Sequence, residues 1–137
     1  MRTAVDSSVL LDLLTDDPQW AEASGEALGK ARAEGSLIIG ETVVAEIRPV
    51  LPEEAFADFL DDWEIRFVPG TLESASLAGE HFARYLRRNP KRNGIVPDFL
   101  IGAHAQFHAD RLLARDRGYL RDYFRKLKVW IPGRRIH

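Results

Sequence analysis

Short apolar runs that read as β-strands alternate along this chain with longer segments of helical apolar spacing. Runs of this length bounded by turn residues are typical of strands buried on both faces. Helices between successive strands favour a parallel sheet with helices on both faces. The pattern therefore predicts an α/β fold with a central parallel sheet of about five strands flanked by helices. The predicted strands are Thr3–Val5, Leu37–Ile39, Ile65–Val68, Arg111–Ala114 and Val129–Ile131.

The predicted helices follow from apolar spacing and from the positions of glycine and proline. A turn is expected between the fourth and fifth strands. The length of 137 residues, without a linker, a low-complexity stretch or an internal repeat, predicts a single domain over residues 1–137. The helices are expected over 7–14, 18–34 and 42–48, from Pro52 onward, over 72–86, and over 98–108.

Composition excludes several classes of protein. The chain has no Cys, which rules out a disulfide scaffold, a thiolate metal site and a cysteine nucleophile. No apolar run approaches the ~20 residues of a membrane span. The acidic Asp6 comes too early for a signal-peptide core to precede it. We therefore expect a soluble cytoplasmic protein without a membrane segment.

The net charge of −2 conceals a strong asymmetry. Residues 1–83 carry 5 basic and 17 acidic side chains, whereas residues 84–137 carry 14 basic and 4 acidic ones. This distribution predicts an acidic surface and a basic one, and a basic surface attracts polyanions such as nucleic acids. The alternative is an uneven spread of solvated charges without a partner.

Four acidic residues are expected at one edge of the predicted sheet. Asp6 follows the first strand, Glu46 lies in the helix after the second, Asp98 opens the helix before the fourth, and Asp116 follows the fourth. Ligands of open parallel sheets bind beyond the carboxyl ends of the strands. Each acid also has an ordinary structural explanation: a helix cap for Asp6 and Asp98, pairing with Arg48 or another neighbour for Glu46, and a turn for Asp116.

A cluster of carboxylates destabilises a fold unless something offsets its charge. Two unit charges ~4 Å apart repel by roughly 4 kcal/mol at an effective dielectric of ~20. Such groups are either partly protonated or neutralised by a cation. Oxygen ligands suit a hard ion, Mg²⁺ or Mn²⁺, which can activate water and stabilise the charge of a phosphodiester under attack.

Taken together, the four acidic segments resemble the PIN-domain ribonucleases, of the kind that serve as VapC toxins in bacterial toxin–antitoxin pairs. The ordered set, at these distances and in a chain of this length, carries the resemblance, which spans Val5 to about Pro132. One departure is Ala114, because many relatives have Thr or Ser two residues before the last acid. The matching segments are Val5–Leu14, Thr42–Ile47, Val96–Ala105 and Leu112–Tyr119.

The resemblance implies a Rossmann-like, PIN-like sheet and an Mg²⁺- or Mn²⁺-dependent endoribonuclease that hydrolyses RNA phosphodiester bonds. The family's acidic positions carry over onto Asp6, Glu46, Asp98 and Asp116 as catalytic and metal-binding residues, with Asp6 and Asp98 ranked first. The resemblance further implies a VapB-like antitoxin partner and a homodimer formed through the helices around 51–63 or 72–85.

Candidate RNA contacts come from the basic half of the chain and from the small polar position after the first acid. They are Ser8, Arg87, Arg88, Arg92, Arg115 and Arg117. A solvated helix end explains the arginines near residue 88 equally well. His104 and His108 have the spacing of a zinc pair, but a packed, hydrogen-bonded histidine is the stronger interpretation.

Other functions remain open from sequence. One alternative is a non-catalytic PIN-like module that binds RNA or a protein, and another is a housekeeping RNA-processing nuclease. A haloacid-dehalogenase phosphatase is disfavoured because Ser8 stands where that class needs a second Asp. A receiver domain is disfavoured because the third strand ends in Val68-Pro69-Gly70, without an acceptor Asp.

Overall fold

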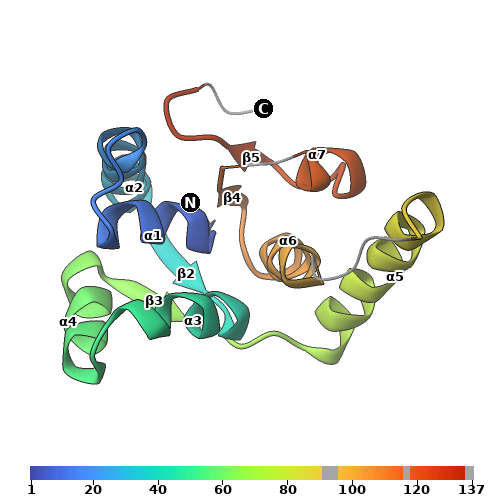
Figure 1. Cartoon of the computed structure of the whole chain (residues 1–137), viewed down its shortest axis with the longest axis horizontal. Helices are drawn as coiled ribbons and strands as arrows, with labels where there is room; N and C mark the ends of the chain where they lie inside the picture. The colour runs from blue at the N-terminus through green and yellow to red at the C-terminus, as the bar shows by residue number, and fades with distance from the viewer. Residues whose placement is uncertain (91–95, 116–117, 135–137) are drawn as a thin grey trace.

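A five-stranded parallel sheet forms the centre of the computed structural model (Figure 1). The structure describes residues 1–90, 96–115 and 118–134. The strand order is β3-β2-β1-β4-β5, and all four neighbouring pairs are parallel. This confirms the predicted fold class. The strands are β1 (Arg2–Val5), β2 (Ser36–Ile39), β3 (Ile65–Phe67), β4 (Arg111–Leu113) and β5 (Val129–Trp130).

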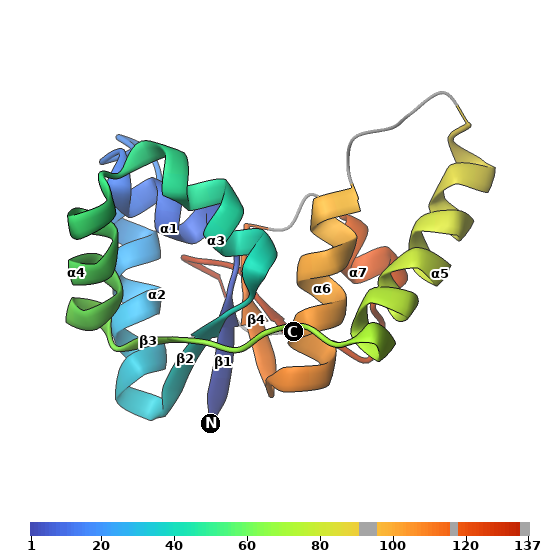
Figure 2. The same ribbon diagram turned by 90° about the horizontal axis from the view of Figure 1, so that it is seen from below.

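Helices cover both faces of the sheet, as Figure 2 shows. Helices α1 to α4 lie on one side of the strands and α5 to α7 on the other. The sheet grows from β1 in one direction to β2 and β3 and in the other to β4 and β5, so right-handed crossovers place these two groups on opposite faces. The helices are α1 (Ser7–Leu14), α2 (Ala21–Glu34), α3 (Glu41–Ile47), α4 (Glu53–Trp63), α5 (Leu72–Arg88), α6 (Val96–His108) and α7 (Tyr119–Tyr123), with a 3₁₀ turn at Arg48–Val50.

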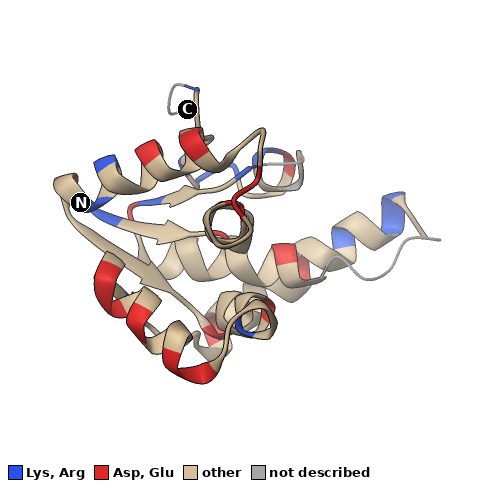
Figure 3. Cartoon of the chain, turned by 60° about the vertical axis from the view of Figure 1, so that its left-hand side comes forward, with Lys and Arg blue, Asp and Glu red and all other residues tan. Residues whose placement is uncertain are grey.

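The two helical layers differ in charge, as the sequence asymmetry predicts. Figure 3 shows red residues along α4 and blue residues at the far end of α5. The acids of α4 are exposed and occupy positions 53, 54, 58, 61 and 62. The exposed arginines of α5 are Arg84, Arg87 and Arg88. The acidic and basic surfaces therefore belong to helices on opposite faces of the sheet.

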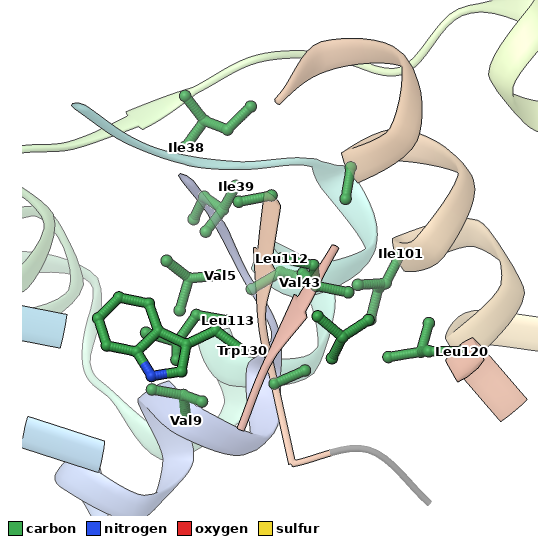
Figure 4. Close-up of a cluster of buried hydrophobic side chains, with 14 of the residues drawn as sticks. Val5, Val9, Ile38, Ile39, Val43, Ile101, Leu112, Leu113, Leu120 and Trp130 are labelled. Atoms are coloured by element: carbon green, nitrogen blue, oxygen red, sulfur yellow. The ribbon is translucent and has the colours of Figure 1, made fainter. Parts of the chain in front are cut away.

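The hydrophobic core lies where the sheet meets its helices (Figure 4). Central strand residues such as Val5, Ile38 and Leu112 are almost completely buried. These near-continuous apolar strands match the sequence pattern expected for a sheet covered on both faces. An aromatic group joins α5, α6 and α7, in which the ring centroids of Phe99 and Tyr123 lie 5.4 Å apart.

The structure corrects two sequence expectations about helices. The second helix begins at Ala21 and not at Pro18. The side chain of Asp17 accepts hydrogen bonds of 2.9 Å from the backbone N–H groups of Gln19 and Trp20, which holds that segment in a turn. The connection between β4 and β5 contains the short helix α7, where only a turn was predicted.

The chain extends the sheet from β1 first towards β2 and β3 and later, on the other side of β1, towards β4 and β5. The candidate site lies at this switch point between β1 and β4. In open parallel sheets the crevice at such a switch point, beyond the carboxyl ends of the strands, is the usual ligand site. The backbone N–H of Asp6, directly after β1, donates to the carbonyl oxygen of Leu113 at 2.9 Å. Among the described residues, no helix is long and apolar enough to cross a membrane.

Candidate active site at the β1–β4 edge

Asp6 lies at the switch point and also caps helix α1. Its carboxylate accepts a hydrogen bond from the backbone N–H of Ser8 at 3.2 Å and another from the Ser8 hydroxyl. The helix-cap explanation from sequence is therefore correct. It does not exclude a second role, because a carboxylate that accepts two hydrogen bonds keeps further lone pairs.

The electrostatic environment of Asp6 disfavours its charged form. Burial raises the pKa of the Asp6 carboxyl above its usual value of 3.8. Hydrogen bonds from Ser8 and Ser7 and the positive charge of Arg115 act in the opposite direction without cancelling the effect of burial on this pKa. A cation beside this carboxylate would restore its ionised form.

Glu46 reaches the same edge from helix α3. The Ser7 hydroxyl donates to its Oε1 at 3.0 Å, so neighbouring serines contact the two acids. Desolvation raises the pKa of Glu46 above 4.5, the hydrogen bond from Ser7 lowers it in part, and the negative charge of Asp6 raises it further. The predicted alternative partner, Arg48, instead donates to the carbonyl oxygen of Leu51 at 2.7 Å.

Of the other two predicted acids, the structure describes only Asp98. Asp98 is half-buried in the first turn of α6, a helix that packs against both β1 and α3. Asp116 lies outside the described residues. Within the described part of the chain, no three acidic or histidine side chains come together closely enough to hold a metal ion. The three described acids therefore do not complete a metal site in this arrangement.

A partly buried ion pair between Asp12 and Arg115 lies next to this edge. Asp12 is 2 % exposed and accepts hydrogen bonds from Ser24 at 2.7 Å and from Arg115 at 2.8 Å. The Arg115 guanidinium also lies 5.0 Å from the ring centroid of Trp20. The backbone N–H of Arg115 donates to the Ser8 hydroxyl at 3.2 Å, which links this pair to Asp6.

Asp12 was not singled out from sequence, although it is buried and paired with Arg115. The signal that could have identified it is the one that marked Asp6, an acid with apolar neighbours, because Asp12 stands between Leu11 and Leu13. Ser7 was also missed, and nothing in its local sequence indicates a contact with α3.

The predicted RNA contacts divide into three groups. Arg87 and Arg88 are exposed at the end of α5, and the Arg88 guanidinium lies 5.8 Å from the Tyr123 ring centroid. Ser8 and Arg115 belong to the network around Asp6, so their contact with RNA stays a prediction. Arg92 and Arg117 lie outside the described residues.

His104 supports the structural interpretation made from sequence. It is buried, and its Nε2 donates to the carbonyl oxygen of Val68 at 2.7 Å, since a carbonyl only accepts. Desolvation lowers the pKa of His104 below 6.5. The neutral ring thereby connects α6 to the chain after β3.

Comparison with known proteins identifies the family. The sequence model of the PIN domain matches residues 3–125. This chain belongs to the PIN domain family. Members of this family are generally nucleases, and PIN nucleases generally use divalent metals. No curated protein matches the chain in sequence.

Solved structures support the same fold for this PIN domain. It is similar to VapBC2 from Rickettsia felis bound to a DNA fragment from their promoter, with a TM-score of 0.69 and 17% identity over 96% of this chain and 98% of that one. It is also similar to FitAcB from Neisseria gonorrhoeae, with a TM-score of 0.67 and 20% identity over 95% of this chain and 97% of that one. For VapBC-1 from nontypeable Haemophilus influenzae the TM-score is 0.68 and the identity is 16%, over 98% of this chain and 100% of that one.

Proposed function

We propose that this PIN domain is a metal-dependent endoribonuclease that hydrolyses RNA phosphodiester bonds and acts as a VapC-type toxin. The observation that carries the proposal is the Asp6–Glu46 pair at the switch point of the sheet. The pKa of each carboxyl is raised, and the charge of Asp6 contributes to the shift of Glu46. Carboxyl groups whose pKa values are shifted by partial burial and by each other's charge are typical of active sites.

The residues present suit a hard divalent cation. The described donors at this edge are carboxylate and hydroxyl oxygens, which Mg²⁺ and Mn²⁺ prefer. Asp6, Glu46, Asp98 and Asp116 would hold the ion. A bound ion of this kind lowers the pKa of a coordinated water and stabilises the charge that develops on a phosphodiester.

The chain's own contribution is to orient these acids. Ser8 donates to Asp6 from both its backbone and its side chain, which fixes the Asp6 carboxylate at the start of α1. Ser7 holds Glu46 at 3.0 Å from the adjacent position. The positive charge of Arg115 favours the ionised form of Asp6. The Arg115 guanidinium itself forms an ion pair with Asp12 and not with Asp6 or Glu46.

RNA cleavage by purified protein tests the proposal. Single-stranded RNA is incubated with wild type and with Asp6→Asn, Asp98→Asn and Glu46→Gln, each with Mg²⁺, with Mn²⁺ and with a chelator. We expect cleavage by wild type only with metal, and a loss of at least about a hundredfold for Asp6→Asn and Asp98→Asn. The matched control is Asp58→Asn, an exposed acid on α4, which should cleave like wild type.

Two results would contradict this function. Metal-independent cleavage, or equal cleavage by wild type and Asp98→Asn, would remove the carboxylates from the chemistry. RNA binding without any cleavage would instead favour the non-catalytic module considered from sequence.

The toxin role and the antitoxin partner are part of the proposal. They are supported by the fold that this chain shares with the VapBC and FitAcB proteins, one of which, VapBC2, is bound to a DNA fragment from its promoter. A carboxylate-rich edge would accept an antitoxin Arg, whose planar guanidinium binds carboxylates in a bidentate manner. The homodimer expected from sequence stays a prediction.

Growth of a bacterial host separates the toxin from a housekeeping nuclease. Expression of wild type should arrest growth, Asp98→Asn should not, and co-expression of a small DNA-binding protein encoded next to the gene should restore growth. Equal growth of wild type and Asp98→Asn, with both proteins soluble and wild type active on RNA, would favour a housekeeping nuclease.

A further inference from the structure

A polar pocket, separate from the candidate active site, lies on the face of the sheet occupied by α5, α6 and α7. Its volume is about 290 Å³, near the lower end of the range for small-ligand sites. Four cationic residues, Arg84, Arg88, Arg125 and Lys126, line it and come from α5 and from the segment after α7. Leu77, His81, Gln106, Asp122 and Tyr123 complete the lining.

The charge of this pocket favours an anion. Among the described residues that line it, Asp122 is the only carboxylate, and it forms an exposed ion pair with Arg121 at 3.3 Å. Four cations and one acid leave an excess of positive charge in a concave surface, which concentrates anions.

Two of the cations are held in place. The guanidinium groups of Arg84 and Arg88 lie 5.5 and 5.8 Å from the centroid of the same Tyr123 ring. Arg84 also donates to Nδ1 of His81 at 2.6 Å. Burial and the charge of Arg84 lower the pKa of His81, so this ring stays neutral and continues to accept. Guanidinium groups fixed in this way match the oxygens of a phosphate.

The pocket shares helix α6 with the candidate active site. Gln106 lines the pocket and Asp98 lies eight residues earlier on the same helix, a separation of about 12 Å along its axis. Asp6, Glu46 and Asp98 are not among the described residues that line the pocket, and an RNA strand of a few nucleotides spans the distance between Gln106 and Asp98.

We propose that the pocket lined by Arg84, Arg88, Arg125 and Lys126 binds a backbone phosphate of single-stranded RNA away from the cleaved bond. This proposal rests on the proposed ribonuclease function. It assigns the basic half of the sequence to substrate binding and separates that role from the chemistry at Asp6 and Glu46.

Binding of a short fluorescent single-stranded RNA in excess chelator tests the proposal without cleavage. Two double variants remove the pocket cations, Arg84→Gln with Arg88→Gln and Arg125→Gln with Lys126→Gln. The second pair leaves the two arginines over the Tyr123 ring intact, so it remains informative if the first fails to fold. The control is Arg66→Gln with Arg134→Gln, which removes the same charge from β3 and from the chain beside α2.

We expect each pocket variant to bind RNA about tenfold more weakly and to lower the slope of log affinity against log salt by about 0.7 for each RNA phosphate that is no longer neutralised. The control should change affinity by less than about threefold, as expected for net charge alone. Inorganic phosphate should compete with RNA for wild type more strongly than chloride does at equal ionic strength.

Three results would overturn the proposal. Equal reductions in the affinity of the pocket and control variants would show a general effect of net charge. Competition by inorganic phosphate with unchanged RNA binding in both pocket variants would indicate a site for a free anion. Displacement of RNA by polyglutamate as effectively as by unlabelled RNA would indicate an acidic protein partner.

The two proposals can fail separately. In an Asp6→Asn background, Arg125→Gln with Lys126→Gln should weaken RNA binding by the same factor as in wild type, because the pocket does not involve that carboxylate. If the protein does not cleave RNA but its RNA binding still depends on the pocket cations, only the nuclease function is contradicted. Normal metal-dependent cleavage with unchanged binding in the pocket variants would contradict only the phosphate site.

Discussion

The carboxyl groups of Asp6 and Glu46 both have pKa values raised above their ordinary values. Because burial raises the pKa of both groups, the folded protein binds protons more tightly than the unfolded chain does. Stability from these groups is therefore present at low pH and is lost as pH rises through the raised values. The window opens at the ordinary values of 3.8 and 4.5 and extends upward.

We predict that metal-free Asp6→Asn is as stable as wild type or more stable at pH 7, and that its stability depends less on pH between about 4 and 7. Asn is also a good helix cap, so the α1 cap survives the change. The lowered pKa of His104 makes the fold less stable as the pH falls below 6.5, but this contribution is the same in wild type and in Asp6→Asn. Denaturant unfolding at several pH values measures the difference. A clear loss of stability in Asp6→Asn at pH 7 would make Asp6 a structural cap only.

The buried Asp12 gives a prediction of the opposite sign. Asp12→Asn removes the charge that pairs with Arg115 and should destabilise the fold by about 2 kcal/mol, less than a fully buried pair because Arg115 is one-third exposed. The destabilisation should shrink when Arg115→Gln is already present. A double-mutant cycle measures this coupling, and additive effects would show that the pair contributes nothing.

At the scale of elements, the contact between α6 and α7 depends on the absence of a side chain. A Cβ on Gly102 would lie 2.8 Å from Cε2 of Phe124 and 2.9 Å from Cδ2 of Leu120. Gly102→Ala should cost about 1–3 kcal/mol through overpacking, although alanine favours helix. Gly79→Ala in α5 is the matched control, because nothing lies within 4 Å of its Cβ, and it should stabilise by up to about 1 kcal/mol. Thermal unfolding of both variants checks the contrast, and an equal response would contradict the α6–α7 packing.

At the scale of the whole molecule, metal binding should stabilise the fold as a unit. A ligand at a hundredfold excess over its Kd adds about 2.7 kcal/mol to the free energy of unfolding. Mn²⁺ should therefore raise the Tm of wild type by several degrees and have little effect on Asp6→Asn or Asp98→Asn. Scanning calorimetry with and without Mn²⁺ measures this shift. The same rise in all three proteins would place the ion elsewhere.

Apolar patterning alone was enough to predict the fold class, the positions of the strands and the parallel sheet. Buried parallel strands are apolar along most of their length, so short apolar runs such as Leu37–Ile39 indicate where they lie. It also placed Asp6 and Glu46 at one edge, because the carboxyl ends of parallel strands meet there. The phosphate pocket was not predictable, since Arg84 and Lys126 come from segments that only the packing of α5 and α7 brings together.

Which polar groups pair depends on how distant segments of the chain pack in the fold. Asp12 and Arg115 are 103 positions apart, and Ser7 and Glu46 are 39 apart, so no local pattern relates them. The strand order was likewise fixed by packing, which put β4 beside β1 and brought the backbone of Asp6 to Leu113. Apolar periodicity is a local property that each segment carries in its own residues. A hydrogen bond between distant side chains depends on where two elements are placed, and the folded core sets that placement.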